Sequence, residues 1–170
     1  MNEVESRQTF DKIVSEYGER LYWHVRRFTM SHEDADDLLQ DIYIKVWNAL
    51  PSFRGEAHLF TWLYRIATNE ALNYIRKNRF KAALQRESLE TIMNNSIDDD
   101  PHFDGNELQR ELYKAINSLP PKQKAVFNMR YFDELPYDQI AEITGTSEGA
   151  LKASYHHAYN KVKAELEKKF

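Results

Sequence analysis

The chain has 170 residues, with 27 acidic and 23 basic side chains and no cysteine, which excludes disulfides, thiol catalysis and thiolate metal sites. This length allows one domain or two small ones, and a hydrophobic fraction of 42% is typical of a globular protein. No apolar run approaches the roughly 20 residues that span a bilayer, and the acidic N-terminus lacks the features of a signal peptide. We therefore expect a cytoplasmic protein with no membrane insertion of its own.

Apolar residues recur at helical spacing in nearly every segment, whereas alternating Val/Ile/Thr stretches of strand type are absent. Glycine and proline are scarce, at five each, so long helices are plausible. The sequence therefore predicts an all-α fold. Apolar spacing predicts helices at about 9–28, from the N-cap Ser31 to about 50, and at about 59–78.

The second predicted helix carries carboxylates at spacings of three and four, at Asp34, Asp37 and Asp41, with Gln40 beside the last. A metal site is disfavoured because the chain has no Glu-x-x-His partner, and the His32-Glu33 segment ends in Asp36 where a zinc-protease motif needs histidine. A solvated acidic face and a docking surface for a basic partner remain as alternatives, which periodicity alone does not separate.

Residues 52–86 contain seven bases and only two acids. Within them, a loop at 53–58 leads into a helix on which aromatic, basic and amide side chains alternate. Arg65, Asn69, Asn73 and Arg76 share one polar face of that helix, which ends in the basic run 76–79. A cationic face beside aromatic residues suits single-stranded or opened DNA. The alternative is a solvated face, and we expect Trp62 itself to lie in the core.

Periodicity fails between about 88 and 105, and residues 87–111 hold eight acids and one base. This composition predicts a flexible acidic linker that is too poor in apolar residues to pack. We therefore expect two small helical domains, 1–86 and 106–170, joined by a linker at 87–105. The alternation of basic and acidic segments indicates separate surfaces for separate partners.

The segment 137–151 has the spacing of a helix-turn-helix. Ala141 is small where two helices approach, Gly145 supplies the positive φ of a tight turn, and Leu151 packs the second helix back on the first. Ser147 can cap that second helix, with Glu148 in its first turn. Such a unit places its second helix in a DNA major groove, although an ordinary helical hairpin has the same spacing. The residues expected at the DNA are Ser147 and Glu148 at the start of this helix and, on its outward face, Gly149, Lys152, Ala153, His156 and Tyr159.

Three segments together resemble bacterial RNA polymerase sigma factors. Residues 34–47 (DADDLLQDIYIKVW) resemble region 2.2, and residues 53–56 (FRGE) with 61–69 (TWLYRIATN) resemble the melting and recognition regions that follow it. Residues 119–127 (LPPKQKAVF) with the helix-turn-helix resemble region 4. The match covers both predicted domains in the right order, and the short two-domain form is similar to the extracytoplasmic-function group of the sigma-70 family.

The resemblance implies a protein that binds core RNA polymerase and directs promoter recognition, DNA melting and transcription initiation. Gln40 and Asp41, with Asp34 and Asp37 on the same helix, would dock on the clamp helices of the beta-prime subunit. The loop at 53–58 would capture a base flipped from the promoter, and the acidic linker would thread toward the RNA exit path. An anti-sigma factor is a usual partner in the family. The residues implied at the melted promoter element are Phe53, Arg54, Gly55, Glu56, Arg65, Asn69, Asn73, Arg76, Lys77 and Arg79.

The chain departs from the family where arginines are common, at Ser154, His157 and Tyr159. Phosphate anchoring by region 4 would then be weaker than in the family, or would come from Lys122, Lys124 and Lys152 instead. The principal alternative is a helix-turn-helix regulator that acts without being a polymerase subunit, but neither a ligand pocket nor a dimer seam is evident in the sequence. For an enzyme, the sequence offers no nucleophile–base set, Gly-rich phosphate loop or metal cluster. We expect no catalytic residue, no cofactor and no metal.

Overall fold

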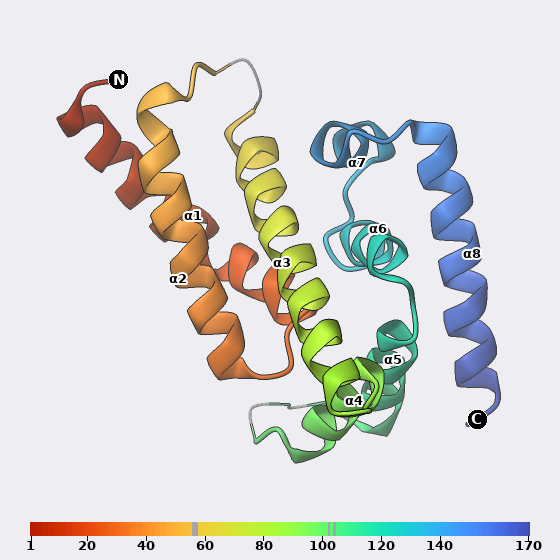
Figure 1. Cartoon of the computed structure of the whole chain (residues 1–170). Coiled ribbons are helices and arrows are strands. Elements are labelled where there is room, and N and C mark those ends of the chain that lie inside the picture. Colours follow the sequence, from red (N-terminus) through yellow and green to blue (C-terminus); the bar gives the residue numbers. More distant parts are fainter. Residues whose placement is uncertain (56–57, 102, 104) are drawn as a thin grey trace.

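The structure is a computed structural model that describes residues 1–55, 58–101, 103 and 105–170. These residues form eight α-helices and one short 3-10 helix, without a strand, which confirms the predicted all-α class (Figure 1). The helices are α1 (Glu3–Arg26), α2 (His32–Ala49), η1 (Leu50–Ser52), α3 (Leu59–Leu84), α4 (Leu89–Asp99), α5 (Glu107–Asn117), α6 (Pro121–Tyr131), α7 (Tyr137–Thr144) and α8 (Glu148–Glu167).

Caps set the helix starts in the N-terminal part. α1 begins six residues before the apolar spacing predicts, because Asn2 forms a capping box with Glu5, with N–O distances of 2.8 and 3.0 Å. The Ser31 hydroxyl accepts a hydrogen bond from the Asp34 amide at 3.1 Å, which confirms the predicted start of α2. α3 extends past the predicted end at 78 to Leu84, since Ala82 still packs one side of its last turns.

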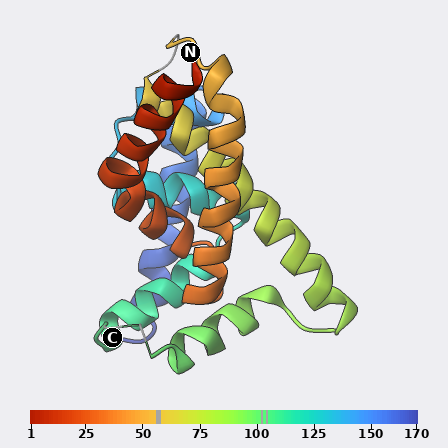
Figure 2. The same ribbon diagram turned by 90° about the vertical axis from the view of Figure 1, so that its left-hand side faces the viewer.

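The prediction that the acidic linker does not pack is wrong for Leu89–Asp99, which form α4. Leu89, Met93 and Ile97 are spaced four residues apart and are 8%, 5% and 7% exposed. Ser88 caps the helix by accepting from the Thr91 amide at 3.1 Å. The high acidic content conceals this short apolar stripe, because only three residues form it. α4 packs mainly on α5, and in Figure 2 α4 and the end of α3 extend to one side of the helical body.

The helix-turn-helix spacing is confirmed at α7 and α8. Gly145 ends α7 with φ +73°, in the left-handed region that favours glycine. The Ser147 hydroxyl accepts from the Ala150 amide at 3.2 Å, and this cap starts α8. Leu151 is 1% exposed and holds α8 against the rest of the C-terminal helices.

We refer to α1–α3 as the N-terminal half and to α5–α8 as the C-terminal half. One continuous apolar core joins them, because Met129, Ile140 and Ile143 pack in the same cluster as Leu63 and Ala67 of α3. A second, smaller core lies within the C-terminal half around Phe127 and Val162. Figure 1 shows α3 between the α1–α2 pair and the C-terminal helices, with α6 and α7 beside it and α8 farthest away.

Candidate partner and nucleic-acid surfaces

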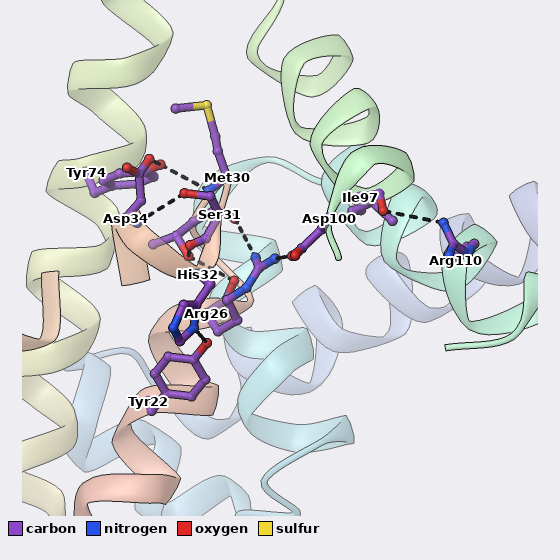
Figure 3. A network of polar contacts seen from close by, with 11 residues as sticks. Tyr22, Arg26, Met30, Ser31, His32, Asp34, Tyr74, Ile97, Asp100 and Arg110 are labelled. Carbon is purple, nitrogen blue, oxygen red and sulfur yellow. Dashed lines mark hydrogen bonds and ion pairs between the residues drawn. The ribbon is translucent and has the colours of Figure 1, made fainter. Parts of the chain in front are cut away.

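The acidic residues of α2 do not all share one role. Asp37, Gln40 and Asp41 are exposed, as a docking surface requires. Asp34 is instead tied to α3, because the Tyr74 hydroxyl donates to its Oδ2 at 2.6 Å and itself accepts from the Met30 amide at 3.0 Å (Figure 3). Burial, together with the bond to Asp34, raises the pKa of Tyr74, so the phenol stays a donor at neutral pH. Asp34 therefore fixes α2 on α3.

The loop that precedes α3 presents one base and one partly covered aromatic ring. Arg54 is exposed, and Gly55 has φ +72°, which turns the chain sharply. Phe53 is half-buried on Trp62, with ring centroids 4.8 Å apart. Trp62 is also half-buried at the edge of the main core, so the expectation that it lies in the core holds only in part. Glu56, which the resemblance assigned to this site, lies outside the described residues.

The polar face of α3 is largely open. Arg65, Asn69 and Arg76 are exposed, and Asn73, half-buried, accepts from the Arg76 guanidinium at 3.0 Å. Asn69 borders a shallow hollow of about 470 Å³ between α2 and α3, at whose edge Lys45 forms an ion pair with Glu70. Lys77 and Arg79, farther along α3, are exposed as well. The structure thus brings Arg65, Asn69, Asn73 and Arg76 together on one face.

The outward face of α8 is exposed along its first three turns. Ser147, Glu148, Gly149, Lys152, Ala153, His156 and Tyr159 all lie there. The Lys152 ammonium is 5.8 Å from the centre of the Tyr137 ring, so a residue of α7 flanks it. On the opposite side, Leu151, Ala158 and Val162 are buried. α8 therefore has the exposed polar face that a major-groove helix needs.

One predicted phosphate anchor is wrong in this arrangement. Lys124 is 2% exposed, and its ammonium donates to the Asn117 side-chain oxygen at 3.0 Å. Burial lowers the pKa of Lys124 from 10.5 to about 7. It faces the Phe28 ring at 5.9 Å, where α6 meets the end of α1. Lys122, two residues earlier, is exposed and remains able to reach a phosphate.

A buried polar cluster lies between the halves, and the sequence pattern did not predict it. His24 is fully buried on α1, stacked on the Tyr64 ring at 4.3 Å, and its Nε2 lies 2.8 Å from the Thr68 hydroxyl. Its Nδ1 lies 3.4 Å from Asp133, whose other oxygen accepts from Arg27 at 3.2 Å. The sequence indicates this cluster only weakly, through His24, a histidine on the apolar face of the first predicted helix between Leu21 and Phe28.

Charges and burial set the protonation of this cluster. Burial lowers the pKa of His24 and outweighs the opposing effect of Asp133, so the imidazole is neutral at pH 7. For Asp133, burial raises the pKa, but the contacts with His24 and Arg27 outweigh it and leave the pKa below its usual value. Asp133 is therefore ionised between the two halves.

The part of the chain that the structure describes contains no group of three or more His, Asp or Glu side chains placed to hold a metal ion. None of its helices is both long and apolar enough to cross a membrane.

Two family models match the chain, one in the N-terminal half and one in the C-terminal half. The model for sigma-70 region 2 matches residues 13–81, which include the α2 face, the loop and most of α3. The model for sigma-70 region 4 matches residues 109–162, which include the helix-turn-helix. The chain belongs to the sigma-70 family.

Full-length relatives place the chain in the extracytoplasmic-function group. It is 28% identical over 169 residues to the ECF RNA polymerase sigma-E factor of Haemophilus influenzae, covering 95% of this chain and 89% of that one. It is also 28% identical over 166 residues to the RNA polymerase sigma factor YlaC of Bacillus subtilis, covering 97% and 96%. The chain is thus a sigma factor, a protein that directs RNA polymerase to promoters and starts transcription there.

Solved structures share the fold. The sigma factor RpoE of Bartonella quintana, in complex with the anti-sigma factor NepR, superposes with a TM-score of 0.71 at 22% identity, covering 94% of this chain and 98% of that one. CnrH in complex with the cytosolic domain of CnrY gives a TM-score of 0.72 at 21% identity, covering 96% and 91%. Both matches extend over the two halves.

Proposed function

We propose that this sigma factor docks on core RNA polymerase through the exposed side of α2, holds the melted promoter strand with the 53–58 loop and α3, and reads the upstream duplex with α8. The observation that carries the proposal is that α2, α3 and α8 each have an apolar side and a separate polar side. Each buries its apolar side in the core and leaves exposed a polar side that sequence resemblance assigns to polymerase or DNA.

Docking is assigned to Asp37, Gln40 and Asp41, which are exposed on α2. Their apolar neighbours Leu38 and Ile42 are 7% and 0% exposed, so the fold does not need the polar side chains for its own packing. Carboxylates on such a face suit a basic partner, which the family resemblance identifies as the clamp helices of the beta-prime subunit. Asp34 contributes indirectly, because its bond to Tyr74 sets the position of the helix.

Strand opening is assigned to the loop and to α3. The exposed Arg54 and the Phe53–Trp62 ring pair supply one cation and two stacking surfaces beside the exposed Arg65 and Asn69. Unpaired bases stack on aromatic rings while basic side chains neutralise their phosphates. The basic residues Arg76, Lys77 and Arg79 follow along α3 and would face the duplex that flanks the opened segment.

The upstream duplex is assigned to α8 and Lys122. With Ser154, His157 and Tyr159 in place of arginine, and with Lys124 buried, Lys152 and Lys122 are the cations best placed for phosphate. Specific binding by such a small set is weak without a second attachment, and core polymerase supplies that attachment.

We further propose that the polymerase-docking and promoter-melting functions lie in domain 1–86, that the helix-turn-helix lies in domain 106–170, and that the protein acts in the cytoplasm as an initiation factor rather than an enzyme. An anti-sigma factor is its proposed inhibitor, since both structural neighbours were solved in complexes and one of these partners is described as an anti-sigma factor.

The test is reconstitution with bacterial core polymerase on a library of promoters. The proposal requires promoter-specific initiation that depends on this chain and is lost with Gln40→Ala/Asp41→Lys. The alternative, a helix-turn-helix regulator outside the polymerase, predicts specific nanomolar binding to duplex DNA by the chain alone and no initiation with core polymerase.

A further inference from the structure

Two adjacent histidines lie on the outward face of α8. His156 and His157 are both exposed, and their ring centres lie 6.1 Å apart. The Nε2 atom of His156 lies 3.1 Å from the side-chain nitrogen of Asn160, one turn farther along the helix. Because an amide nitrogen donates its hydrogen, this contact fits an Nε2 atom that accepts, which is the neutral form of the ring. The arrangement is therefore that of an uncharged imidazole open to solvent.

The charge of this face depends on the two rings. From Glu148 to Asn160 the permanently charged side chains are Glu148 and Lys152, so the segment has no net charge while the histidines are neutral. The next cation, Lys161, donates to the Ser118 carbonyl at 3.0 Å, at the end of α5. A helix that binds the DNA backbone needs positive charge, since each phosphate contact replaces a counterion. Protonation of the histidines would give this face two positive charges.

No carboxylate in the described part of the chain forms an ion pair with either ring. α8 packs on α5, α6 and α7, whose carboxylates are Glu107, Glu111, Asp138 and Glu142. Apart from the exposed Lys122, the cations of these three helices bond to groups other than the histidines, namely Arg110, Lys114, Lys124 and Arg130. An anion from outside the chain can therefore supply the counter-charge for a proton on either ring.

We propose that His156 and His157 bind the DNA backbone in their protonated form, so that the hold of α8 on the duplex strengthens as pH falls, an inference that rests on the proposed function of α8. The ligand is a backbone phosphate, whose recognition needs no particular base. On binding, the Nε2–H group of His156 donates to a phosphate oxygen and gives up its contact with Asn160. Such a bond is charge-assisted and stronger than a neutral one.

Linkage gives the direction and the range of the effect. An imidazole ordinarily changes charge near about pH 6.5, and a phosphate beside it favours the charged form. DNA binding is therefore coupled to proton uptake, and the affinity rises as pH falls from 8 to 6. Each protonated ring that contacts a phosphate also releases a counterion, which steepens the salt dependence of binding by about 0.9.

The first experiment measures the binding of the full-length chain to a fluorescent duplex of arbitrary sequence, by anisotropy, at pH 6 and pH 8 and over a range of salt concentrations. Polymerase is not needed, because the two rings are exposed in the free chain. We expect roughly tenfold tighter binding at pH 6, with a salt slope steeper there by up to about 2. His156→Gln/His157→Gln should remove most of both differences, since glutamine suits a helix and carries no charge.

Two further variants serve as controls, and circular dichroism at both pH values shows whether all the variants stay folded. His58→Gln removes an exposed imidazole at the start of α3 whose side chain makes no capping bond, and it should leave the pH effect intact. His156→Lys/His157→Lys makes the two positive charges permanent. It should bind the duplex at pH 8 about as tightly as the unmodified chain does at pH 6.

An undiminished pH effect in the folded glutamine double variant would overturn the inference. An equal loss of the effect in His58→Gln would also overturn it, because a general change in charge would then explain the result. The same holds if the lysine variant gains no affinity at pH 8.

The second experiment separates this inference from the proposed function. With core polymerase and a promoter that the chain serves, the glutamine double variant should lose most of the pH dependence of promoter binding by the holoenzyme. Promoter-specific initiation together with a pH-independent affinity for duplex DNA would overturn the role of the histidines alone. If the chain initiates at no promoter, the proposed function fails, while the duplex result on the histidines stands by itself.

Discussion

Replacing Lys124 with methionine should stabilise the folded chain at neutral pH. The ammonium is 2% exposed, has Asn117 as a hydrogen-bond partner at 3.0 Å, and lies near the Phe28 ring. Burial lowers its pKa from 10.5 to about 7, so the fold destabilises the charged form that the unfolded chain prefers. Methionine has a similar length and flexibility and fills the same space without a charge.

The magnitude follows from the two pKa values. Lowering the pKa from 10.5 to about 7 costs the fold about 4 kcal/mol at pH 7, at about 1.4 kcal/mol for each pH unit. Loss of the bond to Asn117 offsets about 1 kcal/mol of the gain and leaves an amide without that donor. We expect Lys124→Met to raise the free energy of unfolding by about 2–3 kcal/mol at pH 7.

The pH dependence has a definite sign. Between pH 7 and 10.5 the unfolded chain binds the Lys124 proton and the folded chain does not, so the stability of the unmodified protein rises with pH across this window. Below pH 7 both states bind the proton and the penalty is constant. In Lys124→Met this rise should be absent, and the advantage of the variant should shrink as pH increases.

Urea unfolding followed by circular dichroism at pH 7, 8 and 9 measures both effects. Lys122→Met serves as the matched control, because it removes the same charge from an exposed position two residues away on α6. Equal stability and equal pH slope in the unmodified chain and Lys124→Met would refute the reasoning, because they would mean that the ammonium is hydrated in the folded state.

Three further predictions concern function. Gln40→Ala/Asp41→Lys should abolish co-purification with core polymerase while changing the free energy of unfolding by less than about 0.5 kcal/mol, and retained co-purification would remove α2 from the interface. Arg54→Ala should slow open-complex formation on duplex promoters but much less on templates with a pre-melted bubble, and equal defects on the two would indicate lost docking instead. Lys152→Ala should weaken promoter binding by the holoenzyme uniformly across sequences and reduce its salt slope by about one, whereas altered preference at a single position would indicate a base contact.

Local rules predicted much of the fold. The Ser31 and Ser147 caps and the turn at Gly145 depend on residues within three or four positions of one another, and all of them lie where the sequence places them. The predictions were wrong where the local sequence pattern of a helix was weak. The start of α1 depends on the Asn2 cap rather than on apolar spacing, and α4 depends on three apolar residues within an acidic stretch. Composition described the α4 segment correctly as acidic but could not show that its apolar side is covered.

The exposed faces could be predicted for a related reason. Helical periodicity fixes which side chains share a face, so once Leu151 and Val162 are buried, Lys152 and His156 must lie outside. Periodicity does not tell what a second element will cover. The sequence offers Lys124 as a phosphate anchor because arginines are missing at Ser154, His157 and Tyr159, yet Lys124 is buried where α6 meets the end of α1.

Contacts between the halves had no local signal at all. Arg26 is the last residue of a helix and Arg27 its C-cap, and there basic side chains interact favourably with the negative end of the helix dipole whether or not they have another partner. Asp100 and Asp133 lie in a charged stretch and in a turn, two settings in which aspartate is ordinary. Only three-dimensional packing pairs them. Because an apolar interface alone would tolerate many relative positions of the two halves, the directional bond of Arg27 to Asp133 and the 3.4 Å contact of His24 Nδ1 with the same carboxylate select one of them. The buried polar cluster is therefore what gives the packing of the two halves its specific geometry.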